Sequence, residues 1–113
     1  MLAALTKLDH KVSVYVPTKN KHNEKLLPEV VNELIDYVAS NLSQVAGGAT
    51  SQRVNGYWLG KNGLIKEDVT VIYSYCSNLE EVTIKVLELV QYVKQEANQE
   101  AVSIEINNVL YLV

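Results

Sequence analysis

Two pairs of adjacent carboxylates are the first candidates for chemistry in this sequence. Glu67-Asp68 precedes a run of β-branched residues, and Glu80-Glu81 falls in the first turn of a predicted helix. The helix dipole accounts for the second pair, because acidic side chains are stabilised near a helix N-terminus. Acid–base catalysis by the first pair would need one buried member, so that the two pKa values separate. We interpret Glu67-Asp68 as solvent-exposed, with a small enzyme that uses Glu67 or Asp68 as an alternative.

The other reactive side chains form no recognisable motif. His10 and His22 lie in separate segments, and Cys76 is the single cysteine. Zinc takes three or four such ligands, and a nucleophilic cysteine needs a base beside it. Gly47-Gly48 follows a predicted helix, whereas a phosphate loop follows a strand and opens a helix. The sequence therefore predicts no catalytic nucleophile, no metal site and no cofactor.

Aromatic and basic side chains offer a binding surface. The chain has seven tyrosines and one tryptophan, and such side chains suit half-exposed interfaces. Tyr57 and Trp58 are adjacent in a predicted strand, so they point to opposite faces of the sheet and one of them lies outside. We expect Arg53 and Lys61 to lie near these aromatic side chains once the hairpin folds, where they could meet a small anionic ligand. Lys19, Lys21 and Lys25 could also touch an anion, although solvent-exposed loop lysines are the alternative.

Composition limits the class of protein. The chain has 113 residues, which is one domain by size, and its 48% hydrophobic and 20% charged residues are typical of a globular protein. Residues 28–113 contain eleven acidic and five basic side chains. This acidic body argues against a nucleic-acid partner, because such binding rests on neutralising phosphates.

The same composition bears on the compartment. A single cysteine cannot form an internal disulfide, so we predict a cytoplasmic protein. No charged and then apolar leader opens the chain, so we expect no signal peptide. No apolar run approaches the roughly 20 residues that cross a bilayer, so we expect no membrane contact.

Periodicity and turn signals predict the elements that must position these side chains. Residues 11–16 alternate as a half-buried strand does, and Pro17 ends it. Pro28 suits a first helical position, and Gly47-Gly48 suits a helix C-terminus. Asn107-Asn108 favours a turn into a short last strand, because asparagine tolerates positive φ. The expected elements are strands at 11–16, 51–59, 64–75, 101–106 and 109–113, and helices at 28–45 and 78–97.

This order predicts an α+β fold, a two-layer ferredoxin-like sandwich of the βαββαβ type with an extra C-terminal hairpin strand. Two helices then cover one face of an antiparallel sheet, and the other face stays open. If Val12, Val14 and Val16 face the helices, Tyr15 lies on the open face. We expect residues 1–113 to form a single domain, in which residues 1–9 are a flexible or accessory segment.

Three short segments resemble a group of small ferredoxin-like proteins, which are domains of unknown function in bacteria, archaea and their plasmids or viruses. The segments are Gly47-Gly48-Ala49-Thr50, Gly56-Tyr57-Trp58 and Lys66–Val71. The shared pattern is a glycine–threonine turn, a glycine–aromatic strand and a glutamate before a hydrophobic strand. The resemblance implies the fold over residues 11–106 and implies no activity.

If the group has a shared site, the resemblance also implies where it lies here. The matching residues are Thr50, Tyr57 or Trp58, and Glu67, with Arg53 and Lys61 as neighbours. A purely structural role for these residues, in turns and in a hairpin, is the alternative. The ligand-binding candidates are therefore Thr50, Arg53, Tyr57, Trp58, Lys61 and Glu67.

These observations lead to a main functional prediction and one further alternative. The main prediction is a non-enzymatic binding module that acts as a homo-oligomer, because an exposed hydrophobic edge strand at Val109–Val113 would be paired with a second subunit. The alternative is a viral or plasmid-borne protein that sequesters or senses a small, anionic, nucleotide-like ligand between subunits.

Overall fold

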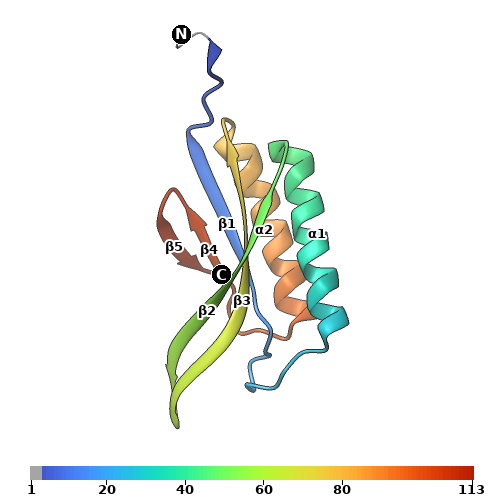
Figure 1. The fold of residues 1–113 in the computed structure, drawn as a ribbon, viewed down its shortest axis with the longest axis vertical. Helices are drawn as coiled ribbons and strands as arrows, with labels where there is room; N and C mark the ends of the chain where they lie inside the picture. The colour runs from blue at the N-terminus through green and yellow to red at the C-terminus, as the bar shows by residue number, and fades with distance from the viewer. Residues whose placement is uncertain (1–3) are drawn as a thin grey trace.

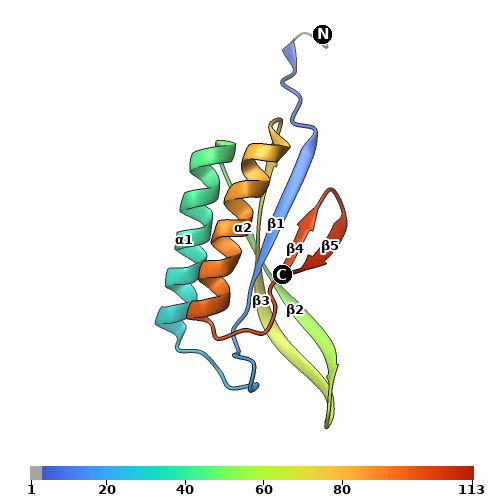
Figure 2. The same cartoon turned by 180° about the vertical axis from the view of Figure 1, so that it is seen from behind.

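The secondary structure follows the predicted order. The computed structural model describes residues 4–113. Its elements are β1 (His10–Val16), α1 (Pro28–Ala46), β2 (Thr50–Gly60), β3 (Gly63–Cys76), α2 (Leu79–Glu96), β4 (Ser103–Ile106) and β5 (Val109–Leu112). The strands form one sheet in the order β2-β3-β1-β4-β5, with antiparallel neighbours. Both helices cover the same face of that sheet (Figures 1 and 2). The predicted ferredoxin-like sandwich with an extra C-terminal hairpin is confirmed.

Local signals explain where the elements begin and end. Pro28 opens α1, and Gly47 ends it with a left-handed φ of 92° and an N–H that donates to the carbonyl of Ser43. Asn78 caps α2, because its side-chain oxygen accepts a hydrogen bond from the backbone N–H of Glu81 at 3.1 Å. Asn107 and Asn108 both have positive φ in the turn between β4 and β5. Each of these positions carries the residue type that its backbone conformation favours.

The hydrophobic core lies between the helices and the central strands. Val12, Val14 and Val16 of β1 are fully buried, as their alternation predicts. Burying one such side chain contributes about 1.5–3 kcal/mol, so the core fixes the face that β1 turns toward the helices. The other members of the core come from every layer; the main ones are Leu34, Val38, Leu42, Ile72, Val82, Val86, Leu89, Val90, Val93, Val102 and Ile104.

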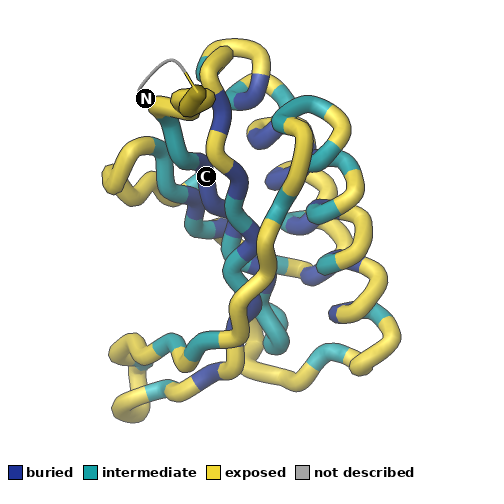
Figure 3. The backbone as a smooth tube through the Cα atoms, turned by 45° about the horizontal axis from the view of Figure 1, so that its top comes forward, coloured by how far each residue is buried: buried dark blue, intermediate teal, exposed yellow. Residues whose placement is uncertain are grey.

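The β2–β3 hairpin is longer than the helix layer. Its strands have 11 and 14 residues, and its far end projects beyond the helices (Figures 1 and 2). Much of this end is exposed (Figure 3). In its register Trp58 lies opposite Ile65, and Gly56 lies opposite Glu67. Residues directly opposite each other share a face, so these four residues belong to one side of the hairpin.

The N-terminal segment extends away from the rest of the molecule. Leu5 and Leu8 are exposed, and the described part of the segment lies past the end of β1 (Figure 1). The prediction for residues 1–9 falls in part on residues 1–3, which lie outside the described residues. Within residues 4–113, neither helix has the length and apolar character needed to span a membrane.

Candidate functional site

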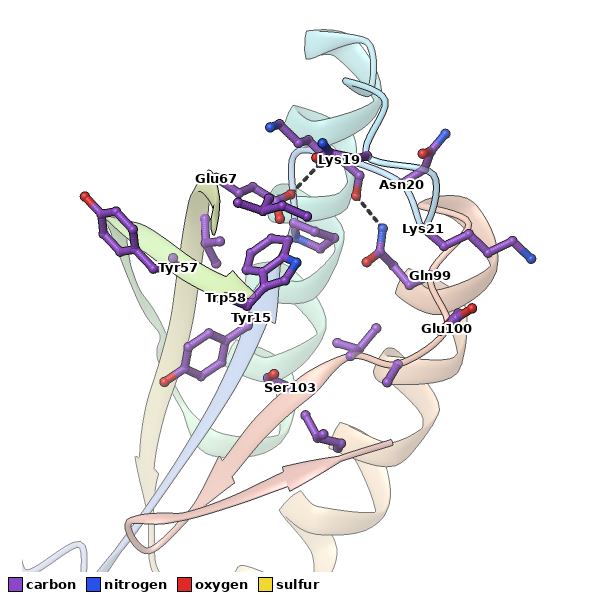
Figure 4. Close-up of a pocket in the computed structure, with 18 of the residues that line it drawn as sticks. Tyr15, Lys19, Asn20, Lys21, Tyr57, Trp58, Glu67, Gln99, Glu100 and Ser103 are labelled. Atoms are coloured by element: carbon purple, nitrogen blue, oxygen red, sulfur yellow. Dashed lines mark hydrogen bonds between the residues drawn. The ribbon is translucent and has the colours of Figure 1, made fainter. Parts of the chain in front are cut away.

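A pocket of about 630 Å³ opens on the sheet face that the helices leave uncovered. Trp58, Ile65 and Glu67 of the hairpin and Tyr15 of β1 form its strand side. Two loops, at 17–23 and 99–103, and the outer strand β5 complete its walls. Figure 4 shows the Trp58 ring and the Glu67 side chain next to each other, whereas the Tyr15 ring points away from them. The placement of Tyr15 on the open face confirms the prediction from the alternation of β1.

Glu67 is the most unusual residue of the pocket, because this acidic residue is only 5% exposed. Its Oε2 accepts hydrogen bonds from the backbone N–H of Thr18, at 2.7 Å, and from that of Lys19. The Thr18 hydroxyl donates to the carbonyl of Asp68 at 2.6 Å and so holds the same loop against β3. A buried carboxylate is costly unless such donors compensate for lost hydration. The loop therefore keeps this carboxylate in place.

The second oxygen of Glu67 is available to a ligand. Oε1 accepts no hydrogen bond from the described residues. No fully buried side-chain oxygen in that part of the chain lacks a partner. Oε1 must therefore retain an accessible surface. One oxygen is fixed by the protein, and the other can accept a donor from one of the two clefts that Glu67 lines.

The absence of a side chain at Gly56 shapes the floor beside Glu67. A Cβ at this position would lie 3.3 Å from Cγ2 of Val69 and 3.6 Å from Cζ3 of Trp58. The indole therefore lies close over the glycine. Trp58 keeps 42% of its surface exposed, so part of the ring is free to stack against a ligand.

Hydrogen bonds join the two loops that face the hairpin. The side-chain amide of Gln99 donates to the carbonyls of Lys19 and Ala97, and the backbone N–H of Lys21 donates to the carbonyl of Asn98 at 2.9 Å. The loop that holds Glu67 is thus attached to the loop that follows α2 (Figure 4). Gln99 was not among the residues predicted from the sequence, because no local motif indicates that its side chain joins the two loops.

Tyr15 forms a hydrogen bond across the sheet. Its hydroxyl donates to Oε1 of Glu105 at 2.9 Å. Burial, and then the hydrogen bond and negative charge of Glu105, raise the pKa of Tyr15 above its ordinary value. Tyr15 therefore stays protonated at neutral pH and keeps its ring fixed at the edge of the pocket.

The structure separates the six candidate residues into three groups. Tyr57, Trp58 and Glu67 line the pocket, although Tyr57 lies at its rim and points away from Trp58 (Figure 4). Arg53 lines a second cleft that also includes Glu67. Thr50 and Lys61 line neither: Thr50 pairs with Tyr73 at the other end of β2, and Lys61 lies in the hairpin turn.

The prediction that both Glu67 and Asp68 are solvent-exposed is wrong. Asp68 is exposed, but Glu67 is buried. Adjacent residues of a strand point to opposite faces, so the same pair meets two environments. The expectation fails because the loop that covers Glu67 is distant in sequence.

Other reactive groups are not gathered into a site. Cys76 is buried in the core, and desolvation raises the pKa of its thiol. Within residues 4–113, no three histidine, cysteine or acidic side chains are grouped so that they could hold a metal ion. The chemistry of the described residues is therefore concentrated in carboxylate, aromatic and basic side chains.

Solved structures with this fold include an enzyme. No protein-family model and no curated protein sequence matches the chain. A phage SAM lyase in complex with S-methyl-5'-thioadenosine superimposes with a TM-score of 0.69 and 19% identity, covering 96% of this chain and 92% of that one. Its apo state gives a TM-score of 0.61 with 19% identity, and coverage of 96% and 94%. CutA from Synechococcus elongatus gives 0.52 with 6% identity, and coverage of 95% and 83%.

This likeness shows the fold, and it also corrects the main functional prediction. We expected a non-enzymatic oligomeric binding module, but the first two of these structures are those of an enzyme, one with a small molecule bound. The alternative prediction of a small nucleotide-like ligand fits these findings better. The main prediction rested on the exposed edge strand at Val109–Val113, which bears on subunit contact and does not distinguish an enzyme from a binding module.

Proposed function

We propose that this protein is an enzyme that binds S-adenosylmethionine in the open-face pocket and cleaves it to S-methyl-5'-thioadenosine. The observation that carries the proposal is the buried carboxylate of Glu67, which has one oxygen held by two backbone amides and one oxygen free beside the exposed ring of Trp58. The SAM lyase fold over nearly the whole chain supports the same substrate class.

The size and lining of the pocket suit an adenosine group. Its volume of about 630 Å³ falls within the range of roughly 300–1,000 Å³ for small-molecule sites. The exposed part of the Trp58 indole offers a flat surface for adenine, since every nucleobase has a face that stacks on an aromatic ring. Tyr15 and Ile65 extend this apolar floor.

Glu67 has a role in recognition. An ionised carboxylate only accepts hydrogen bonds, and S-methyl-5'-thioadenosine offers the ribose hydroxyls as donors. Carboxylates bind ribose hydroxyls in this way in dinucleotide sites. We therefore assign the free Oε1 to the ribose, where it acts on substrate and product alike.

The chemical step makes small demands on the protein. The methionine carboxylate of the substrate attacks its own γ-carbon, the bond from that carbon to sulfur breaks, and sulfur keeps the electron pair as a neutral thioether. The products are a lactone and S-methyl-5'-thioadenosine, and no water is consumed. Because the leaving group is neutral, it needs no proton. The pocket contributes by holding the substrate in a reactive conformation.

Sequestration without cleavage is the second candidate function. It uses the same pocket, and the same observations on Trp58 and Glu67 favour it. We also retain the prediction of a cytoplasmic homo-oligomer. All four residues of β5 are exposed, as are Leu59 and Leu64 at the hairpin end, and a second subunit would remove this apolar surface from water.

One experiment separates these functions. The purified protein is incubated with a hundredfold excess of S-adenosylmethionine, and the mixture is analysed by liquid chromatography and mass spectrometry. An enzyme produces S-methyl-5'-thioadenosine and the lactone in more than stoichiometric amounts. Saturable binding with no product supports sequestration. Absence of both binding and product would reject the assignment of this pocket.

A further inference from the structure

A second cleft, of about 690 Å³, lies on the other side of the β2–β3 hairpin. It is bounded by the hairpin, by the loop that connects β1 to α1, and by the first turns of α1. Figure 2 shows this loop running from the start of α1, below the end of α2, to β1. Because Trp58 and Glu67 face the open side, strand alternation directs Arg53 and Lys66 to this side.

The cleft concentrates positive charge in a chain whose net charge is −3. Four of the chain's ten lysine and arginine side chains line it, namely Lys19, Lys25, Arg53 and Lys66. Its acidic members are Glu67 and Asp68. Four positive and two negative groups give a formal charge of +2, because 4 − 2 = 2. Like charges held together repel one another, and a bound anion lowers that energy.

These cations are not neutralised within the described part of the chain. Among residues 4–113, the ion pairs join Lys7 to Asp9 and Lys85 to Glu88, and neither pair lies in the cleft. The fixed oxygen of Glu67 is already occupied by the amides of Thr18 and Lys19. Lys19 Nζ donates to the carbonyl of Lys66 at 3.2 Å, and Lys66 Nζ lies 5.8 Å from the centre of the Tyr57 ring. Lys25 and Arg53 have no side-chain partner among the described residues, so these two are free to pair with a ligand.

The remaining lining indicates the shape of that ligand. Apolar side chains from the loop and α1, including Leu26, Val31 and Ile35, form one wall. The hydroxyl-bearing Ser51 and Thr70 lie on the hairpin side. An apolar wall beside a cationic rim suits a molecule with a compact apolar body and a doubly charged head. A guanidinium matches the oxygens of phosphate in a bidentate arrangement.

We propose that this second cleft binds a small organic phosphate monoester, with Lys25 and Arg53 pairing with the phosphate and the apolar wall contacting the organic part. This inference is independent of the proposed function. The two sites share Lys19, Glu67 and Val69, but Lys25 and Arg53 belong to the second cleft alone.

Phenyl phosphate is the probe, because it has an apolar ring and a dianionic head and contains no nucleoside. Its binding is measured by isothermal titration calorimetry at low ionic strength, on the full chain. The test variant is Lys25→Gln with Arg53→Gln. The control variant is Lys61→Gln with Lys94→Gln, which removes the same two charges outside the cleft. Thermal unfolding of both variants checks that they fold.

We expect saturable binding of one phenyl phosphate per chain. Affinity should fall about tenfold or more in the test variant, because two charge-assisted contacts are lost, and should change by less than about twofold in the control, where only distant screened charges are removed. An equal loss in both variants would mean a nonspecific response to net charge and would overturn the proposal. Absence of saturable binding to the wild-type chain would overturn it as well. Titration of the test variant with S-methyl-5'-thioadenosine measures binding to the first pocket separately. Failure of the phosphate proposal can therefore be distinguished from failure of the proposed function.

Discussion

On the open side of the hairpin, Trp58 and Ile65 flank a buried carboxylate, whereas on the opposite side Arg53 and Lys66 extend into a charged cleft. Both sides belong to the same two strands, and at the hairpin's far end neither is covered by a helix (Figures 1 and 2). A hairpin that met only water would be polar on both sides. Both sides carry apolar side chains, Trp58 and Ile65 on the open side and Leu59 and Leu64 on the other, so both are candidate binding sides. The two sides differ in charge, and this difference assigns a neutral, aromatic ligand group to the open face and an anionic group to the other.

Replacing Glu67 should have the largest effect on the open side. In Glu67→Gln, the side-chain carbonyl can still accept from the amides of Thr18 and Lys19, but the charged acceptor at Oε1 is lost. A hydrogen bond to a charged group contributes about 1.5–3 kcal/mol, so affinity for S-methyl-5'-thioadenosine should fall up to about 100-fold. Calorimetric titration measures this loss.

The matched control for that variant is Asp68→Asn. Asp68 is the next residue and is exposed on the other side of the strand, so its replacement should change the affinity by less than about twofold, as is usual for surface positions. Equal losses in the two variants would remove the distinction between the two sides of the hairpin. Product formation from S-adenosylmethionine should likewise fall in Glu67→Gln and change little in Asp68→Asn.

Trp58→Ala should have the next largest effect. Stacking of a base on an aromatic ring contributes about 1–3 kcal/mol, so we expect a loss in affinity of about tenfold, with Trp58→Phe in between. Leu59→Ala is the control, because Leu59 is adjacent, 83% exposed and on the opposite side. If Leu59→Ala weakens binding as much as Trp58→Ala, the ligand does not stack on the open face.

The sequence predicted the two-sided character of this hairpin better than it predicted the site. Alternation alone places Arg53 and Trp58 on opposite sides, so they could not have formed one site. Thr50 shares the face of Trp58, but eight residues of strand separate them by about 26 Å. The caps and turns were predictable because each depends on one or two local residues, such as Gly47 and Asn107.

The burial of Glu67 could not be predicted in the same way. It depends on amides of Thr18 and Lys19, which are 49 and 48 residues distant, and on Gln99, which fastens their loop. Only the crossing of β1 next to β3 brings these groups together. A site made from three separate loops and strands leaves no spacing pattern in the sequence.

A smaller loss in affinity should follow from filling the space at Gly56. In Gly56→Ala the new Cβ would lie 3.3 Å from Cγ2 of Val69, which must give by a few tenths of an ångström, and would make an ordinary van der Waals contact of 3.6 Å with the Trp58 ring. We expect affinity to fall about threefold and unfolding free energy to change by less than about 1 kcal/mol. Gly48→Ala is the control for added side-chain volume, since a Cβ there meets nothing within 4 Å. Unchanged affinity in Gly56→Ala would mean that the ligand does not use the space beside Gly56.

The smallest effect on binding is expected from Tyr15→Phe, which keeps the ring at the pocket edge and removes the hydrogen bond to Glu105. Here the change is in stability: the wild type should exceed the variant by about 1 kcal/mol in unfolding free energy at neutral pH, the usual contribution of one hydrogen bond. Urea denaturation at several pH values measures the difference.

The pH dependence of that difference follows from the raised pKa of Tyr15. The folded state holds the phenol proton more tightly than the unfolded chain, whose tyrosines titrate near about 10. The stabilisation is therefore complete below this pH and is lost as pH rises through the folded-state pKa, where a phenolate would face the carboxylate of Glu105. The difference in unfolding free energy between wild type and Tyr15→Phe should be constant from neutral pH to about pH 9.5 and should decrease above it. If the difference in unfolding free energy instead shrank on acidification and stayed constant at alkaline pH, its pH dependence would come from the carboxylate of Glu105 and not from the phenol of Tyr15.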